Sequence, residues 1–195
     1  MTCIVGLVDK KRVWMGVDSL GVAGYSKTSR EDMKLFKCAG VENAMISYTT
    51  SFRMGQLLMY GEFFEELEVL KDKINHKYMV TKFVPKIQKA FEDGGFGTIK
   101  SGEKVGGSFL VAFRGRLFRV ESDYQVGVNS IGYAADGCGA DLALGSLHAT
   151  SSLKILPRER VLMALRAATE FSAGVAPPFH VANTDDCKIE TEFDV

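Results

Sequence analysis

The chain opens with MTCIVGLVDKKRVWMGVDS (residues 1–19), in which a polar turn joins two apolar segments. These segments, Cys3–Val8 and Arg12–Asp18, predict a β-hairpin. Thr2 stands directly before the first predicted strand. Removal of Met1 would give Thr2 a free α-amine beside its hydroxyl group, and the two groups are a potential base and nucleophile in one residue.

The composition is that of an ordinary globular protein, since 46% of the 195 residues are hydrophobic and 25% are charged. The length suits one domain, residues 1–195, and we see no repeat, low-complexity segment or linker that would divide it. Lys and Arg together number 24, as do Asp and Glu. The resulting net charge of zero gives no reason to expect nucleic acid or a membrane as a partner.

Two further features indicate a cytoplasmic protein. The apolar start lacks the basic region and cleavage site of a signal peptide, and no apolar run approaches the roughly 20 residues that span a bilayer. No cysteine pair has C-x-x-C spacing, which favours free thiols in a reducing compartment. The cysteines are Cys3, Cys38, Cys138 and Cys187. The scattered histidines indicate surface or packing positions rather than a metal site: His76, His148 and His180.

Predicted strands and helices follow one another in separate runs. The first strands are the opening hairpin, a loop or short strands over Leu20–Ser29, then Met33–Cys38 and Asn43–Tyr48. Later elements are helices over Phe52–Lys71 and Lys77–Phe91, strands at Ser108–Phe113 and Arg116–Glu121, a strand pair or bent strand over Val126–Ala135, helices over Ala140–Thr150 and from Pro157 to about Phe171, and closing strands at His180–Ala182 and Lys188–Phe193. Such segregated runs favour an α+β layered sandwich.

A threonine nucleophile sets requirements for its neighbours. An α-amine, with an unperturbed pKa of about 8, is partly neutral at physiological pH and can accept the hydroxyl proton. A nearby cation favours the neutral amine, and a buried cation needs a carboxylate partner. Asp18 and Lys34 lie at the ends of predicted strands and could supply both groups. The simpler interpretation of these two residues alone is a loop cap and a surface lysine.

At this point the sequence resembles the start of proteasome-type β subunits, which are N-terminal-nucleophile hydrolases. Simple bacterial peptidases partnered with an unfoldase ATPase, and related phage proteins, share this start. The family has an acid sixteen residues after its nucleophilic threonine and a lysine thirty-two after it. Thr2, Asp18 and Lys34 match both offsets without a gap. The resemblance implies catalytic roles for these three residues. It also implies a four-layer αββα sandwich, with two antiparallel sheets between helix pairs.

The resemblance extends less sharply to residues that would support the site. In the stretch Ser47–Ser51, the backbone N–H groups of Tyr48 or Thr49 correspond to the family's oxyanion donors, although the usual glycine is absent. The alternative is that Thr49–Ser51 only caps the following helix. Cys138 stands where the family has a serine that helps to hold the amine. Its glycine-rich turn is not a dinucleotide loop, since G-x-G-x-x-G would need glycine at Leu142.

The end of the predicted helix that begins at Pro157 also resembles the family. Ser172 and Glu170 correspond there to a serine and an acid that support the site. The family commonly has the acid three residues before the serine, whereas Glu170 lies two before it. A rival nucleophile, Cys3, would need the loss of two residues and would face away from Thr2, so we assign it to the core.

We therefore expect a threonine peptidase that hydrolyses peptides or unfolded proteins, with Thr2 as nucleophile and no metal or cofactor. A methionine aminopeptidase would suffice to remove Met1. The resemblance implies a homo-oligomer, with a ring and an ATPase unfoldase as further expectations, and the helices at 52–91 are candidates for subunit contacts. Two alternatives stay open: a catalytically inactive scaffold or binding subunit, and an N-terminal-nucleophile amidase that acts on small amides.

Overall fold

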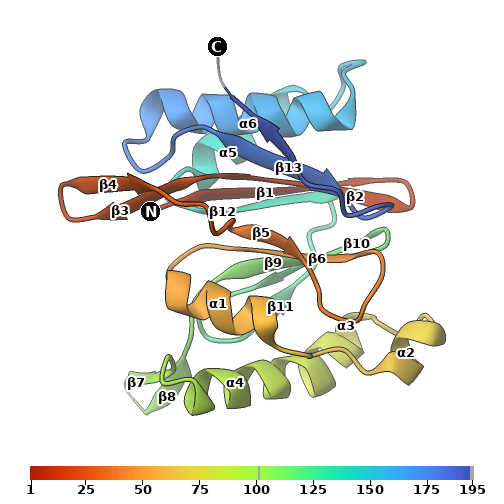
Figure 1. The fold of residues 1–195 in the computed structure, drawn as a ribbon. Helices are drawn as coiled ribbons and strands as arrows, with labels where there is room; N and C mark the ends of the chain where they lie inside the picture. Colours follow the sequence, from red (N-terminus) through yellow and green to blue (C-terminus); the bar gives the residue numbers. More distant parts are fainter. Residues whose placement is uncertain (101, 194–195) are drawn as a thin grey trace.

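Two antiparallel sheets lie face to face between two layers of helices in a computed structural model of the chain (Figure 1). The structure describes residues 1–100 and 102–193. The strand order is β12-β1-β2-β13-β14 in the first sheet and β11-β10-β9-β6-β5 in the second. This arrangement is the four-layer αββα sandwich of the α+β class that the resemblance implies.

The first sheet consists of β1 (Cys3–Asp9), β2 (Arg12–Asp18), β12 (Tyr133–Gly137), β13 (Phe179–Asn183) and β14 (Glu190–Glu192). The second sheet consists of β5 (Leu35–Lys37), β6 (Ala44–Tyr48), β9 (Phe109–Phe113), β10 (Arg116–Val120) and β11 (Val126–Gly127). Two separate hairpins are formed by β3 (Leu20–Ala23) with β4 (Ser26–Ser29), and by β7 (Thr98–Lys100) with β8 (Glu103–Val105). The β3–β4 hairpin projects from the body of the molecule beside the N-terminus (Figure 1).

Helices cover the outer face of each sheet. The first sheet is covered by α5 (Ala140–Ala149) and α6 (Pro157–Phe171). The second is covered by α1 (Phe52–Tyr60), α2 (Glu66–Leu70), α3 (His76–Tyr78), the π-helical turn η1 (Met79–Phe83) and α4 (Val84–Asp93). Three buried hydrophobic clusters fill the two sheet–helix interfaces and the space between the sheets. None of the helices within 1–100 and 102–193 is long and apolar enough to cross a membrane.

The close approach of α6 to β2 depends on Gly16. A Cβ atom at this position would lie 2.4 Å from Val161 Cγ1 and 3.0 Å from Leu165 Cδ1. Because glycine has no Cβ, the helix packs directly on the strand. Pro157 occupies the first turn of α6, where a missing N–H is tolerated, so the helix begins where the sequence predicts.

Two sequence predictions about secondary structure are wrong. The helix expected over Phe52–Lys71 is interrupted, because the chain turns extended at Gly61 and the Phe63 ring fills the space where a Cβ at position 61 would be. The segment Val126–Ala135 is neither a strand pair nor one strand. Its two ends, β11 and β12, pair with β10 and β1, so this segment crosses from one sheet to the other.

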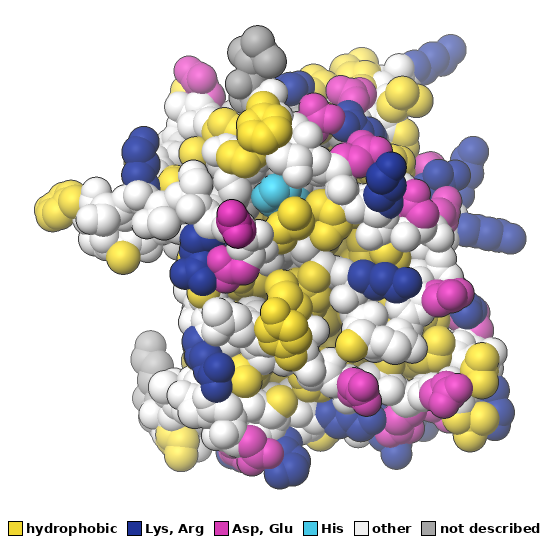
Figure 2. Space-filling view, viewed as in Figure 1, with side chains coloured by type: hydrophobic (Ala, Val, Ile, Leu, Met, Phe, Trp, Pro, Cys, Tyr) yellow, Lys and Arg dark blue, Asp and Glu magenta, His cyan; other side chains and the backbone are white. Residues whose placement is uncertain are grey.

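Figure 2 shows basic and acidic side chains interspersed over one face of the molecule. No broad area of a single sign stands out on this face, in keeping with the equal numbers of basic and acidic residues. The ion pairs on the surface of the protein are mostly half-exposed, such as Lys86 with Glu65. The ion pair of Asp18 and Lys34 differs from these because both of its side chains are buried.

Candidate active site

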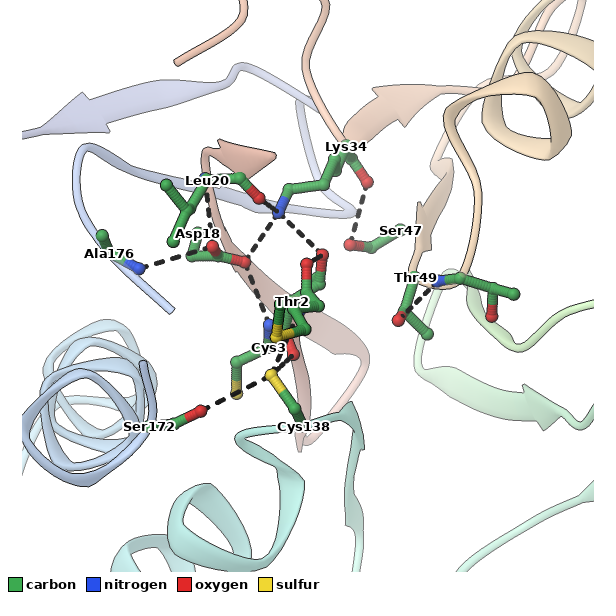
Figure 3. Close-up of polar contacts among 12 residues, drawn as sticks. Thr2, Cys3, Asp18, Leu20, Lys34, Ser47, Thr49, Cys138, Ser172 and Ala176 are labelled. Carbon is green, nitrogen blue, oxygen red and sulfur yellow. Dashed lines mark hydrogen bonds and ion pairs between the residues drawn. The ribbon is translucent and has the colours of Figure 1, made fainter. Parts of the chain in front are cut away.

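The side chains of Thr2, Asp18 and Lys34 meet at one end of the sandwich (Figure 3). Lys34 Nζ lies 2.8 Å from Thr2 Oγ1, 2.8 Å from Asp18 Oδ1 and 3.0 Å from the carbonyl oxygen of Leu20. An ammonium group has three hydrogens to donate. Each of these oxygens can therefore receive one, and the position of the ammonium is fully determined.

The topology explains why residues so far apart in sequence meet. Strands β1 and β2 are antiparallel, with Ile4 opposite Val17, so Thr2 lies beside the end of β2, where Asp18 is located. Lys34 directly precedes β5 in the second sheet. Its side chain therefore reaches from one sheet to the other. All three site side chains are buried, with exposed fractions of 4% for Thr2, 0% for Asp18 and 3% for Lys34.

Backbone donors fix the Asp18 carboxylate. Its Oδ1 atom accepts a hydrogen bond from the N–H of Cys3 at 3.0 Å. Its Oδ2 atom accepts one from the N–H of Leu20 at 3.0 Å and a longer one from Ala176 at 3.5 Å. A buried carboxylate is stable only when its oxygens are paired, and these donors together with Lys34 meet that condition.

Burial dominates the electrostatics of Lys34. It lowers the pKa of the Lys34 ammonium below the usual 10.5 of lysine, while the Asp18 carboxylate opposes the change. Burial also lowers the pKa of His180, on β13 beside β2, and the positive charge of Lys34 lowers it further. An ammonium in contact with Thr2 also disfavours a positive charge on a free Thr2 amine.

The backbone nitrogen of Thr2 is an amide here, because Met1 precedes it. This nitrogen donates a hydrogen bond to Cys138 Sγ at 3.4 Å, and Thr2 Oγ1 donates one to the Met1 carbonyl oxygen at 2.5 Å. Met1 is 53% exposed, whereas Thr2 is buried. Loss of Met1 would place a free amine beside the Cys138 thiol and on the same residue as the hydroxyl group.

The structure also brings Cys138 and Ser172 to the site. Cys138 lies in the turn between β12 and α5 and is exposed. Its Sγ atom is 3.5 Å from the Thr2 carbonyl oxygen and accepts a hydrogen bond from Ser172 Oγ at 3.5 Å. Gly174 makes room for this contact, since a Cβ atom there would lie 2.6 Å from Cys138 Sγ.

Glu170 is not part of this group. It is exposed on α6, and within residues 1–100 and 102–193 no hydrogen bond joins it to the site. The expectation that Glu170 supports the site is therefore corrected. Thr169, three residues before Ser172, has a buried hydroxyl without a hydrogen-bond partner in the described part of the chain.

The backbone donors expected at Tyr48 and Thr49 are already occupied. The Tyr48 N–H donates to the carbonyl oxygen of Lys34 and the Thr49 N–H to that of Ser108, each at 3.1 Å. Neither is available to an oxyanion, which corrects the sequence-based assignment. The next N–H, that of Thr50, donates to the adjacent Thr49 Oγ1 at 2.6 Å and to no other acceptor within residues 1–100 and 102–193.

Thr50 has an unusual backbone. Its φ of +69° lies in the left-handed region, which glycine adopts readily and β-branched residues rarely do. Such strain is often found at functional sites.

The side chain of Tyr48 points away from Thr2, into the helical layer, where its ring packs against Phe52 and over Gly55. Tyr48 therefore does not obstruct the nucleophile.

Other reactive side chains lie apart from the site or are inaccessible. Cys3 is completely buried, and burial raises the pKa of its thiol. Across residues 1–100 and 102–193, no group of three or more His, Cys, Asp or Glu side chains is placed to hold a metal ion. His180 bonds to Thr191 Oγ1, and His148 to the Tyr133 hydroxyl.

Comparison with solved structures shows which known proteins share the fold of this chain. Thiobacillus denitrificans BPH superposes with a TM-score of 0.72 over 96% of this chain and 99% of its own, at 16% identity. The fold is that of proteasome-like peptidases. Eukaryotic HslV from Trypanosoma brucei gives a TM-score of 0.65 at 16% identity, covering 93% of this chain and 98% of its own. A mutant of Anbu from Hyphomicrobium gives 0.70 at 11% identity, covering 98% and 87%. No family model and no curated protein matches the sequence.

Proposed function

We propose that the chain is a threonine-type peptidase in which Thr2, freed of Met1, is the nucleophile. The observation that carries the proposal is the contact of Lys34 Nζ with both Thr2 Oγ1 and Asp18 Oδ1, at 2.8 Å each, in a buried site. A lysine that served only to keep the surface polar would be exposed to solvent, whereas Lys34 is 3% exposed. Lys34 instead provides a positive charge at the place where a nucleophilic oxygen forms.

The reaction follows from these contacts. Thr2 Oγ1 bonds to a peptide carbonyl carbon, and its proton passes to the Thr2 amine, directly or through one water. The amine then gives this proton to the leaving nitrogen as the peptide bond breaks. Water, activated by the same amine, hydrolyses the acyl-enzyme. Lys34 keeps the amine neutral, Asp18 holds Lys34, and the thiol of Cys138 and hydroxyl of Ser172 position the amine.

The comparisons support the proposal at the level of fold. One of the BPH structures is a complex with Epoxomicin, and it covers 96% of this chain with a TM-score of 0.71. We propose that the Thr2 site accepts the same compound. We further propose that residues 1–195 form one domain, which works in the cytoplasm as a homo-oligomer. We propose that this oligomer is a ring and that its partner is an unfoldase ATPase.

Two other functions have an observation in their favour. An inactive scaffold would fit the occupied N–H groups of Tyr48 and Thr49. It would leave the buried Asp18–Lys34 pair unexplained, since burying two charges is costly even when they are paired. An amidase for small molecules would use the same Thr2 chemistry. Turnover of fluorogenic peptides, compared with that of simple amides, distinguishes the amidase from the peptidase.

The deciding experiment is the intact mass of the purified protein before and after exposure to a threonine-reactive β-lactone. We expect loss of Met1 and addition of one acyl group that maps to Thr2. Thr2→Ala should abolish both acylation and turnover, while Thr28→Ala, in the exposed strand β4, should leave both unchanged. Retention of Met1, or a trimmed chain that never acylates in its assembled state, would favour the scaffold instead.

A further inference from the structure

The N–H of Thr50 and the hydroxyl of Thr49 form an unusual pair beside the nucleophile. Thr49 Oγ1 accepts the Thr50 N–H at 2.6 Å, and the Thr49 side chain is 6% exposed. Within residues 1–100 and 102–193 no acceptor receives the hydrogen of the Thr49 hydroxyl. A hydroxyl that accepts one hydrogen bond keeps its own hydrogen to donate. Thr49 therefore has a donor that the folded protein leaves unused.

Thr49 lies beside the residue that carries the nucleophile. Figure 3 shows Thr49 and Asp18 on opposite sides of Thr2. Gly137 packs against both threonines, because a Cβ atom there would lie 2.2 Å from the Thr2 carbonyl oxygen and 3.4 Å from Thr49 Oγ1. The Thr49 hydroxyl thus lies close to Thr2, on the side opposite Asp18.

Neighbouring contacts hold this pair in place. The Thr49 N–H bonds to the Ser108 carbonyl oxygen at 3.1 Å, and Thr50 Oγ1 accepts the Ser108 N–H at 3.2 Å. Gly107 permits the approach, since a Cβ atom there would lie 2.8 Å from Thr50 Cβ. The peptide between Thr49 and Thr50 is therefore anchored on Ser108, directly before strand β9, and the left-handed backbone of Thr50 is set before any substrate binds. Preorganised donors of this kind stabilise a developing charge without a cost of reorganisation.

We propose that the Thr49 hydroxyl is a catalytic residue that donates a hydrogen bond to the oxyanion formed when Thr2 attacks, a role that rests on the proposed peptidase function. As Thr2 Oγ1 bonds to the carbonyl carbon, the carbonyl π pair moves to its oxygen, and the Thr49 O–H donates to that oxygen. The Thr50 N–H stays bonded to Thr49 Oγ1 and polarises it, so the backbone dipole acts through the hydroxyl. Thr49 itself neither gains nor loses a proton.

A donor at the Thr49 hydroxyl would replace the backbone N–H groups of Tyr48 and Thr49, which are not free to bind an oxyanion. Both of those N–H groups are committed to neighbouring carbonyl oxygens. The Thr50 N–H points to a side-chain oxygen of its own segment. The hydroxyl hydrogen is then the donor that Thr49 has left to offer, and an oxyanion beside Thr2 is the acceptor that its chemistry fits.

Substitution at position 49 tests the role. Thr49→Val keeps the shape and removes the donor, Thr49→Ser keeps the donor, and Thr81→Val removes an exposed hydroxyl on η1 as a control. We expect Thr49→Val to lower kcat on a fluorogenic peptide about 10²–10³-fold with KM nearly unchanged, and to slow β-lactone acylation of Thr2. Thr49→Ser should stay within roughly ten-fold of the unaltered protein, and Thr81→Val should match it.

Each outcome decides the role of Thr49. If the unaltered protein acylates and Thr49→Val retains or exceeds its kcat, the hydroxyl only occupies the Thr50 N–H and the role is overturned, while the peptidase proposal stands. Equal losses in Thr49→Ser and Thr49→Val, with a lowered melting temperature in both, also overturn it, because the residue is then structural. If the unaltered protein loses Met1 but neither acylates nor hydrolyses any peptide, the proposed function and the role of Thr49 fall together.

Discussion

Lys34 Nζ lies 2.8 Å from Asp18 Oδ1, and the exposed fractions of the two side chains are only 3% and 0%. Taking two charges out of water costs more free energy than their attraction commonly returns. The pair is therefore a poor choice for stability alone. It becomes intelligible through the second contact of Lys34, with the hydroxyl group of Thr2. The same arrangement makes Asp18 important for stability in a way that can be measured.

Asp18→Asn should destabilise the fold strongly, because it leaves the Lys34 ammonium buried without its partner. Breaking a buried pair in this way costs about 3–5 kcal/mol, which corresponds to a melting temperature lower by roughly 6–20 °C for a chain of this size. Glu65→Gln, which breaks the half-exposed pair with Lys86, is the control and should shift the melting temperature by less than roughly 4 °C. Thermal unfolding followed by circular dichroism measures both. An unchanged melting temperature in Asp18→Asn would contradict this account of the pair.

The rate of Thr2 acylation should rise and then fall with pH. It rises as the Thr2 amine loses its proton, and the Lys34 ammonium places that step below the pH of ~8 that is usual for an α-amine. It falls when Lys34 loses its proton, and burial places that step below the usual 10.5. Asp18 raises the pKa of Lys34, so Asp18→Asn should move the alkaline limb to lower pH, in whatever fraction of the variant stays folded. The measurement is the β-lactone acylation rate across the pH range. Asp93→Asn, at an exposed pair with Lys89, serves as the control. An alkaline limb that does not move in Asp18→Asn would remove Lys34 from the mechanism.

Cys138 should hold the amine of Thr2 without acting as a nucleophile. Cys138→Ala removes the hydrogen-bond partner 3.4 Å from Thr2 N and should slow acylation roughly 2–10-fold. Cys138→Ser should preserve the rate, since an oxygen can take the place of the sulfur. Iodoacetamide should modify Cys138 well before the other three cysteines, which are buried. Peptide mapping after a short exposure identifies the modified thiol, and complete loss of acylation in Cys138→Ser would assign the thiol a chemical role.

The sequence predicts the sandwich because its decisive signals are local. The opening hairpin follows from two apolar segments around a polar turn, and the start of α6 from Pro157. The meeting of Asp18 and Lys34 with Thr2 is implied by the family resemblance that the two offsets carry, and not by the spacing alone, because the contact depends on strand pairing across both sheets. Local patterns do not encode which strands pair. They therefore do not predict that the chain crosses from the second sheet to the first between β11 and β12.

The oxyanion donors were mispredicted for a physical reason. Whether an N–H is free depends on the carbonyl oxygen it faces. The partners of Tyr48 and Thr49 are the carbonyl oxygens of Lys34 and of Ser108, which lies far along the chain, directly before β9. The left-handed φ of Thr50 is equally hidden, because threonine is among the residues least expected there. Only the missing glycine hinted that the backbone at this point differs from that of the family.

The packing of α6 on the first sheet gives a matched pair of glycine substitutions. Gly16→Ala places a methyl group 2.4 Å from Val161 Cγ1, so strand and helix must separate, at a cost of about 1–3 kcal/mol and a melting temperature lower by roughly 2–12 °C. Gly145→Ala adds the same methyl group on the exposed side of α5, where no atom lies within 4 Å. It should raise the melting temperature by roughly 1–4 °C, because alanine favours a helix by about 0.5–1 kcal/mol over glycine. The two variants differ from the natural chain by one identical group, so opposite signs in thermal unfolding would trace the effect to the helix–sheet contact. A Gly16→Ala protein as stable as the natural chain would mean that α6 does not pack on β2 as closely as described.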